Sequence, residues 1–338
     1  MRAEQGREAP AGGTAPGPAL VHAAAIVRSS AEVVDVAAAH LEEGLTAGDL
    51  PVFGGAPETA DAVRRALGLP DGGLEDDPRL CLVGARAPDA MVVIRRLVER
   101  AAATGSGRLR IVAEPQYRDD PRRWREIRRY EAAGNALVGV APLDVLCVYD
   151  RATVPAEALA TARLTHPELA EDGHRVHSAD YLRPEDCLRQ LAAVREPVEA
   201  GAPLWAVDGV PTLPALRGGL RRALASVVPD PDLVADLHLA ASEVAANAFR
   251  HGRPPVSARL WADDTALVCR ITDSGPGFDD PFAGFLPAHG DDLGAGGMGL
   301  WLARKLWDSV DLLPGTAGGF TVRLATTPPG AGTGRGVA

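Results

Sequence analysis

The first 195 residues alternate between short apolar runs and segments in which apolar residues recur at helical spacing. The run Val145–Tyr149 is almost continuously apolar, which is typical of a strand buried on both faces. The other runs that predict strands are Val21–Val27, Leu50–Phe53, Arg79–Val83 and Leu109–Ala113. Helical spacing predicts helices over residues 31–44 (with Gly44 near the C-cap), 58–68, 91–103, 121–134 and 155–163. This alternation predicts an α/β domain with a largely parallel sheet.

Periodicity weakens over residues 196–213, where Pro and Gly are frequent. We therefore expect a linker there, between one domain over residues 21–195 and a second over residues 204–327. The two ends of the chain, residues 1–20 and 328–338, are rich in Ala, Gly and Pro, and this composition predicts disordered arms.

The second domain contains a long helix, predicted over Pro231–Arg250 with Gly252 just past its end. Glu243 and Asn247 are four residues apart in this helix, so they lie on one face and can address one ligand. Taken alone, such a pair is more typical of a solvated helical face.

A strand predicted over Ala266–Thr272, after another over Val256–Trp261, runs into Asp273-Ser274-Gly275-Pro276-Gly277. The two glycines allow a close approach of the backbone or a positive φ directly after the strand. The Asp273 carboxylate can accept a hydrogen bond from an exocyclic amine such as that of adenine. A hairpin turn with a polar tip is the alternative interpretation.

Two further glycine-rich segments follow. Residues 294–300 lead directly into a helix predicted over 300–308, and such a loop offers backbone N–H groups and the positive end of a helix dipole to an anion. The loop lacks the G-K-[ST] ending of a Walker motif. Residues 318–324 begin with glycines and continue as an alternating strand.

In this order the four features resemble the GHKL (Bergerat-fold) ATPases, which fold as an α/β sandwich. The asparagine box corresponds to residues 242–247, and the glycine boxes correspond to residues 273–277, 294–300 and 318–321. The resemblance implies ATP and Mg²⁺ as cofactors. It implies that Asn247 holds Mg²⁺, that Glu243 is the general base, and that Asp273 reads the adenine amine. The other nucleotide-binding residues that it implies are Gly275, Gly277, Gly294, Gly296, Gly297, Met298, Gly299, Leu300 and Thr321.

Within this class, the chain is most similar to the small anti-sigma-factor serine kinases of bacteria. The residues that carry this likeness are Asn-Ala-Phe-Arg-His-Gly at 247–252, a short lid at 278–293, and Gly-Met-Gly-Leu-Trp-Leu at 297–302. The lid contains no Arg or Lys, whereas a phosphoryl-transfer site normally brings a cation to the transferring group. The only lysine, Lys305, lies on the following helix. This departure counts against kinase activity, and it does not count against nucleotide binding.

Residues of about 20–195 are similar to the MEDS-type sensory domain of prokaryotic signalling proteins. The likeness rests on His22 in the first strand, on Leu41–Leu45, on Leu146–Asp150 and on Leu164–Leu169. It implies signal input by a small molecule or a partner at the N-terminal domain.

Several candidate sites in this half are disfavoured by their spacing. The four cysteines stand far apart without a C-x-x-C pair, and His166, His174 and His177 have no matching Cys or acidic spacing, so neither a disulfide nor a metal site is predicted. The His166-Pro167 pair is read as a turn that ends a helix. Glu126 and Glu131 interleave with the arginines of residues 122–129 and the whole chain is acidic, which predicts a solvated helical face instead of a nucleic-acid contact.

Charge and hydropathy exclude other classes of protein. The net charge of the 338-residue chain is −10, which argues against a protein that binds nucleic acid directly. No apolar stretch approaches the roughly 18–20 residues that cross a bilayer, so we expect a cytoplasmic protein without membrane contact.

The leading hypothesis is a sensory domain that governs an anti-sigma-type ATP-binding domain. Such a protein would sequester a sigma factor and phosphorylate a serine or threonine of a STAS-type anti-sigma-factor antagonist. The alternatives are a non-catalytic, nucleotide-gated protein-binding switch and an unorthodox histidine kinase. The missing dimerisation helix pair disfavours the histidine kinase, and a homodimer is left open.

Overall fold

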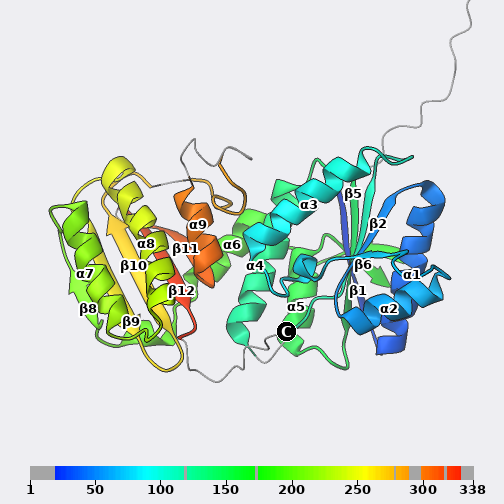
Figure 1. The fold of residues 1–338 in the computed structure, drawn as a ribbon, viewed down its shortest axis with the longest axis horizontal. Helices are drawn as coiled ribbons and strands as arrows, with labels where there is room; N and C mark the ends of the chain where they lie inside the picture. Colours follow the sequence, from blue (N-terminus) through cyan, green and yellow to red (C-terminus); the bar gives the residue numbers. More distant parts are fainter. Residues whose placement is uncertain are drawn as a thin grey trace, which may run out of the picture.

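The computed structural model describes residues 20–117, 120–171, 174–277, 279–288, 298–315 and 318–328. The arms predicted at 1–20 and 328–338 lie outside these ranges, apart from Leu20 and Pro328. Two lobes lie side by side along the long axis of the molecule, each built around its own sheet (Figure 1). Among the described helices, none is both long enough and apolar enough to cross a membrane.

The N-terminal sheet has seven strands in the order β3-β2-β4-β5-β1-β6-β7, and every pairing is parallel except that of β6 with β7. The predicted α/β domain with a largely parallel sheet is therefore confirmed. Its strands are β1 (Leu20–Val27), β2 (Leu50–Gly54), β3 (Glu75–Asp76), β4 (Leu109–Ala113), β5 (Leu143–Asp150), β6 (Glu168–Glu171) and β7 (His174–His177).

Helices cover both faces of this sheet because successive side chains of each strand point to opposite sides. In β1, Ala23 and Ala25 belong to one apolar cluster with residues of α1 and α2, whereas Ala24 belongs to another with residues of α3 and α5. The helices of this domain are α1 (Ser30–Ala47), α2 (Pro57–Ala66), α3 (Ala87–Ala101), α4 (Pro121–Leu137), α5 (Ala156–Thr165) and α6 (Pro184–Ala193).

Two local predictions were wrong. Residues Pro78–Cys81 form a 3-10 helix (η1) rather than a strand, because Asp77 caps it and Pro78 favours a helical first turn. Helix α1 passes through Gly44 and ends at Gly48, whose φ of 80° suits a C-cap. Gly44 lies inside the helix and is buried. A Cβ added to it would lie 2.4 Å from the Cδ of Arg110.

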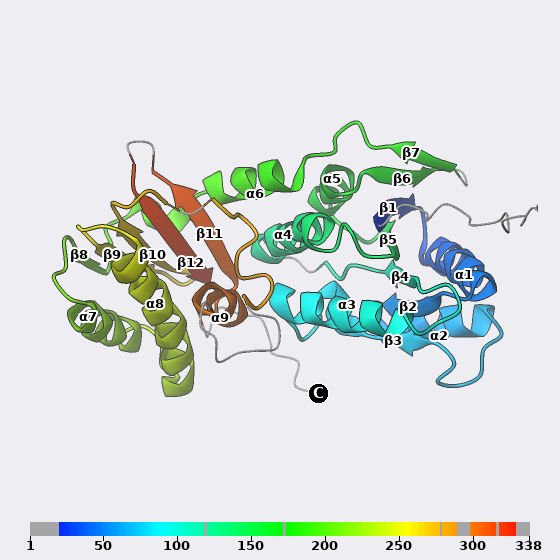
Figure 2. The same ribbon diagram turned by 90° about the horizontal axis from the view of Figure 1, so that it is seen from above.

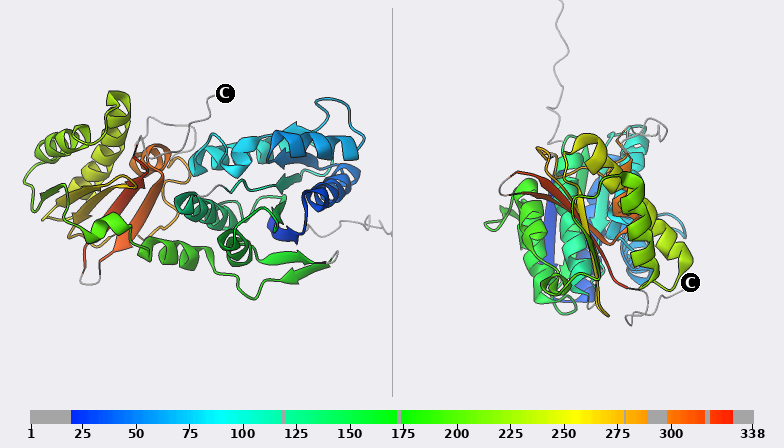
Figure 3. Two further views of the ribbon diagram at one scale, coloured as in Figure 1. Left: turned by 90° about the horizontal axis from the view of Figure 1, so that it is seen from below. Right: turned by 90° about the vertical axis from the view of Figure 1, so that its left-hand side faces the viewer.

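The C-terminal sheet has five antiparallel strands in the order β11-β12-β10-β9-β8, and three helices pack on one of its faces (Figure 3). This arrangement confirms the α/β sandwich. The expected linker, residues 196–213, contains a 3-10 helix η2 (Pro197–Ala200) and strand β8 (Trp205–Val207), which pairs with β9. The remaining elements are α7 (Leu213–Ala225), α8 (Pro231–His251), β9 (Ser257–Ala262), β10 (Leu267–Asp273), α9 (Gly299–Leu306), β11 (Ser309–Pro314) and β12 (Phe320–Thr326).

The other face of this sheet meets α4, α6 and η2, as Figure 2 shows from above. At the centre of the contact, Asp311 of β11 accepts hydrogen bonds from Arg323 at 2.6 Å and from Arg129 of α4 at 2.7 Å. Burial alone would raise the pKa of Asp311, but the two guanidinium groups hold it below its ordinary value. The two sheets are therefore joined through a buried ionic cluster.

The prediction of a solvated face for residues 122–129 was wrong, because this stretch of α4 forms part of the contact between the lobes. The Arg129 side chain is only 4% exposed. Arg122 and Arg125 both form salt bridges with Glu196, at 3.1 and 2.6 Å. Helical periodicity identifies the polar side of a helix, but it does not show whether that side faces water or another domain.

Candidate functional site

A cavity of about 690 Å³ lies in the C-terminal lobe between α8, β10, β12 and the segment 279–288. Its size falls in the range of cofactor pockets. Four of the predicted nucleotide-binding residues line it, namely Asn247, Asp273, Gly277 and Leu300. Apolar side chains of the sheet, including Ile271, Phe320 and Val322, form its floor.

Asn247 and Glu243 lie on the turn of α8 that faces the start of α9. Gly299, the first residue of α9, packs directly against this turn. A Cβ added at Gly299 would lie 3.1 Å from the Asn247 side-chain nitrogen and 3.2 Å from the Glu243 Cβ. Glycine at this position therefore allows the N-terminus of α9 to approach the asparagine closely, as the predicted box requires.

Asp273 stands at the end of β10, and it is 7% exposed. One of its carboxylate oxygens, Oδ1, accepts a hydrogen bond from the Gly275 N–H at 2.7 Å. That bond fixes the carboxylate at the wall of the cavity and leaves the second oxygen, Oδ2, for a ligand.

Gly252 is a site residue that the sequence interpretation missed. A Cβ at this position would lie 2.4 Å from the Cγ of Asp273, so a larger residue would displace the carboxylate. His251 beside it also lines the cavity. The signal was present in the sequence, because both residues end the Asn-Ala-Phe-Arg-His-Gly run that follows Asn247.

The first and third glycine boxes touch each other. Gly319 donates a backbone hydrogen bond to the carbonyl of Gly275 at 3.1 Å. Its φ is 91°, and an added Cβ would lie 2.7 Å from the Asp273 carbonyl oxygen. Gly277 also has a positive φ, of 88°. These conformations favour glycine and keep the turn after β10 narrow.

The structure does not bring every predicted residue to the cavity. Gly294, Gly296 and Gly297 lie outside the described residues, and Met298 occupies the N-cap position of α9. Thr321 lies between two cavity-lining residues of β12, and the alternation of the strand turns it to the opposite face. Its hydroxyl forms a hydrogen bond with the hydroxyl of Thr272 at 2.8 Å.

Glu243 does not line the cavity among the described residues. Its carboxylate faces the Arg217 guanidinium of α7 at 3.7 Å, and its side chain is 42% exposed. Glu243 is one helical turn from Asn247, so it lies beside the position where Asn247 would hold a metal ion.

Comparison with protein families assigns both lobes. Residues 210–326 match the model of the histidine kinase-like ATPase domain, and residues 21–167 match that of MEDS, the methanogen/methylotroph, DcmR sensory domain. The chain thus combines a segment of the MEDS type with a segment of the histidine kinase-like (GHKL) ATPase type. Domains of this ATPase class bind ATP, usually with Mg²⁺, and the match supports an ATP-dependent activity of the kinase type. No curated protein was found to match the chain.

The lid of the ATPase domain is anchored in the MEDS domain. Phe285, in the described part of the lid, has no exposed surface. It is buried in an apolar cluster to which α3, α4 and α6 of the N-terminal lobe contribute. The residues of this lobe in the cluster are Leu82, Ala87, Ala90, Met91, Ile127, Ala133 and Leu188. The segment that the resemblance predicts as the lid is thus held by the N-terminal lobe.

Arg304 of α9, in the ATPase domain, binds the same lid segment through a hydrogen bond. Its Nε donates to the Ala283 carbonyl at 2.8 Å, and another guanidinium nitrogen, Nη1, donates to the Val310 carbonyl at 3.0 Å. Burial lowers the pKa of Arg304 to about 10, so it stays charged at neutral pH. Lys305 pairs with Asp89 of the MEDS domain at 2.8 Å.

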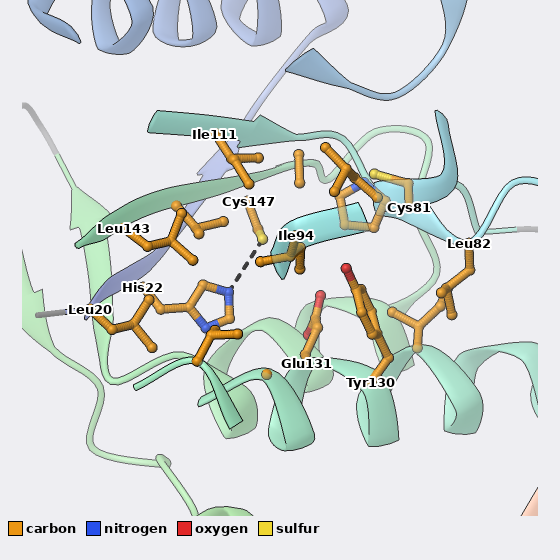
Figure 4. Close-up of a pocket in the computed structure, with 17 residues that line it drawn as sticks. Leu20, His22, Cys81, Leu82, Ile94, Ile111, Tyr130, Glu131, Leu143 and Cys147 are labelled. Atoms are coloured by element: carbon orange, nitrogen blue, oxygen red, sulfur yellow. Dashed lines mark hydrogen bonds between the residues drawn. The ribbon is translucent and has the colours of Figure 1, made fainter. Parts of the chain in front are cut away.

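Helix α4 connects the lid to the interior of the MEDS domain. Ile127 packs in the Phe285 cluster and also lines the cavity inside the MEDS domain, and Leu137 lines the ATPase cavity. One turn after Ile127, Glu131 accepts a hydrogen bond from the Tyr149 hydroxyl at 2.6 Å. The side-chain oxygen of Asn135 forms a hydrogen bond with Nδ1 of His22 at 2.8 Å. The same helix therefore borders both the nucleotide site and an apolar cavity inside the MEDS domain (Figure 4).

Proposed function

We propose that the protein is a regulatory ATP·Mg²⁺-binding protein that acts as an anti-sigma factor with serine/threonine kinase activity under control of its MEDS domain. Its kinase substrate would be a STAS-type anti-sigma-factor antagonist. The observation that carries the proposal is the convergence of Asn247, Asp273 and the start of α9 on one cavity of nucleotide size.

The side chains present fit the cofactor. The side-chain oxygen of Asn247 is a hard ligand suited to Mg²⁺. The free oxygen of Asp273 is an acceptor for the adenine amine. The N-terminus of α9 offers backbone N–H groups and a positive dipole to phosphate. Glu243, beside Asn247, would take the proton of the attacking hydroxyl.

The buried Phe285 supports control by the MEDS domain. Nucleotide entry and release require movement of the lid, and here the lid cannot move without withdrawing Phe285 from the cluster that the MEDS domain provides. A signal that loosens this cluster would therefore change nucleotide exchange and, with it, the affinity for protein partners.

A nucleotide-gated switch without phosphoryl transfer is the second candidate. The described lid residues contain no Arg or Lys, and Lys305 is paired with Asp89. Glu243, the base of the kinase mechanism, pairs with Arg217. The histidine kinase alternative is weaker, because α7, the helix before α8, contains no histidine.

Incubation of the full-length protein with γ-labelled ATP and STAS-type proteins of the same cell tests the proposal. Label that appears on the STAS protein and survives acid but not base indicates phosphoserine or phosphothreonine, as the kinase proposal expects. Acid-labile label on this chain would indicate a histidine kinase. ATP-dependent capture of a sigma factor without any transfer would leave the switch as the function.

A further inference from the structure

Three metal-ligating side chains from distant parts of the sequence meet inside the MEDS domain. They are His22 of β1, Cys147 of β5 and His166, which follows α5, and one ligand atom of each lies within 4.8 Å of the other two. The parallel pairing of β1 with β5 sets His22 opposite Val145, so Cys147 lies two residues further along the same face. Figure 4 shows the imidazole of His22 and the thiol of Cys147 pointing toward each other.

The hydrogen bonds of His22 leave its Nε2 as a free acceptor. Its Nδ1 lies 2.8 Å from the side-chain oxygen of Asn135. The Asn135 nitrogen donates to the Thr165 carbonyl at 2.7 Å, which orients the amide so that its oxygen faces His22. Nδ1 therefore carries the proton, and the lone pair of Nε2 points toward the sulfur of Cys147.

His166 is arranged in the same way. Its Nδ1 lies 2.8 Å from the Ala162 carbonyl, which can only accept, so Nδ1 carries the proton. Its Nε2 is buried and has no hydrogen-bond partner among the described residues. A histidine that donates from one nitrogen to a carbonyl or side-chain oxygen and presents the other to a shared point is the usual arrangement of a metal ligand.

The spacing agrees with the geometry of zinc. With Zn–N about 2.0–2.1 Å and Zn–S about 2.3 Å, a nitrogen and a sulfur on a tetrahedral ion lie roughly 3.5–3.6 Å apart. The Nε2 of His22 lies 3.5 Å from the Cys147 sulfur. The ring centroids of His22 and His166 lie 4.1 Å apart, and one ligand atom of His166 lies within 4.8 Å of those of His22 and Cys147.

From this geometry we infer that His22, Cys147 and His166 bind a transition metal ion of the Zn²⁺ type. Two imidazole nitrogens and a sulfur are ligands that suit Zn²⁺ and exclude Mg²⁺ or Ca²⁺. Burial lowers the pKa of His22 to about 3, with His166 as a second cause, and lowers that of His166 to about 4. Both rings are thus neutral at physiological pH and can donate a lone pair.

Binding converts the Cys147 thiol to a thiolate, because only the thiolate is a zinc ligand. The S–H bond breaks, an S–Zn bond forms, and one proton leaves for each ion bound. Burial raises the pKa of this thiol, so the metal must displace a firmly held proton. Metal affinity therefore falls as the pH is lowered.

The fourth coordination position faces the apolar cavity of the MEDS domain. His22 and Cys147 both line this cavity of about 60 Å³, whose other walls are mainly Leu80, Ile94, Ile111 and Leu143. A water molecule needs at least about 10–15 Å³ of such volume, so the cavity holds water or a ligand of few heavy atoms beside the ion. Three protein ligands and one open position are typical of zinc sites that bind an exogenous molecule.

Titration of chelator-treated full-length protein with Zn²⁺ and Co²⁺ tests the inference. The expected result is one ion per chain, with a thiolate-to-cobalt charge-transfer band in the Co²⁺ spectrum. Cys147→Ser should abolish the band, and His166→Gln should weaken binding. Asn135→Ala, which removes the partner that orients His22 and leaves all three ligands in place, should weaken it by roughly 10–100-fold.

The matched controls are Cys187→Ser, a buried cysteine outside the set, and His177→Asn on the exposed strand β7. Both should bind metal as the wild type does. Wild-type protein that binds no ion, or binds Co²⁺ without the thiolate band, would overturn the inference, and this outcome does not depend on the folding of any variant. A thiolate band that persists in Cys147→Ser, or is lost in Cys187→Ser, would place the site elsewhere.

Discussion

The guanidinium carbon of Arg304 lies 4.0 Å from the centre of the Phe285 ring. Arg304 belongs to α9, which begins at the predicted phosphate-binding loop, and Phe285 belongs to the predicted lid. The contact therefore joins the lid to the helix that follows the loop. Both side chains are buried at the contact with the MEDS domain. The pair is the most direct place to test whether that domain controls the nucleotide site.

Phe285→Ala should accelerate nucleotide release and should also destabilise the protein by about 3–5 kcal/mol, the usual cost of removing a buried phenyl ring. Stopped-flow release of a fluorescent ATP analogue measures the first effect, and urea denaturation measures the second. Phe53→Ala is the matched control, because Phe53 is equally buried on the opposite face of the MEDS sheet. Equal release rates in the two variants would remove the lid anchor from the regulation.

Asp273→Asn should weaken ATP binding by about 1–3 kcal/mol, a factor of roughly 5–150. The substitution keeps an oxygen for the Gly275 N–H but presents an amide donor to the adenine amine. Calorimetry with ATP and Mg²⁺ measures the change, with Asp264→Asn in the exposed β9–β10 turn as the control. An affinity within twofold of the wild type would show that Asp273 does not read adenine.

Gly252→Ala should lower ATP affinity by displacing Asp273, the group proposed to read adenine. The added Cβ would lie 2.4 Å from the Cγ of Asp273 and must displace the carboxylate. Gly218→Ala in α7 is the control, since its nearest side-chain neighbour is an ordinary 3.5 Å away. That control should be neutral or stabilising by roughly 0.5–1 kcal/mol. Normal ATP binding in Gly252→Ala would contradict the close packing at Asp273.

Glu243→Ala should leave ATP affinity unchanged or improved, because a carboxylate beside the phosphates repels them. If Glu243 is the general base, single-turnover transfer to the antagonist should slow by roughly 10²–10⁴-fold. Arg217→Ala removes the partner of Glu243 and should preserve transfer. A Glu243→Ala protein that transfers at the wild-type rate would exclude the base, and a wild type without transfer would favour the switch.

Arg129→Met should destabilise the protein by about 3–5 kcal/mol, because it leaves the buried Asp311 with one cation fewer. Arg100→Met is the control, since the salt bridge of Arg100 with Glu75 is exposed and its loss should cost at most about 1 kcal/mol. Thermal unfolding of the two variants measures the difference. A cost for Arg129→Met no larger than that of the control would show that the ionic cluster contributes little.

The same cluster predicts loss of stability in acid. The pKa of Asp311 in the folded protein lies below the ordinary value of 3.8, so its contribution is fully present above that pH. The contribution disappears as the pH falls through the folded-state pKa. The free energy of unfolding at pH 3 and pH 7 should therefore differ less in Arg129→Met than in the wild type.

Local signals in the sequence predicted most of the fold. The strand at Leu109–Ala113 was predicted with its observed bounds, because an apolar run of this length between turn residues has few alternatives. The strand predicted over Arg79–Val83 has the same apolar character, but the proline before it and the cap at Asp77 make it a 3-10 helix. The choice of helix or strand for short runs thus depends on the flanking residues.

Ordered motifs predicted four of the residues that line the C-terminal cavity, but contacts between distant segments could not be predicted. Gly252 owes its role to the approach of Asp273, twenty-one residues later and on another element. His22, Cys147 and His166 were each noted in the sequence, yet their spacing matches no metal motif. The pairings of β1 with β5 and with β6 bring them together, and spacing rules do not contain those pairings.

Because α4 borders both the MEDS cavity and the nucleotide cavity, the two sites share one mechanical element. Coupling between binding sites is reciprocal as a matter of thermodynamics. If a molecule in the MEDS cavity changes the affinity for ATP by some factor, ATP must change the affinity for that molecule by the same factor. The energy state of the cell would then set the concentration at which the signal is registered, so that the sensor reports a ratio of two metabolites instead of the level of one.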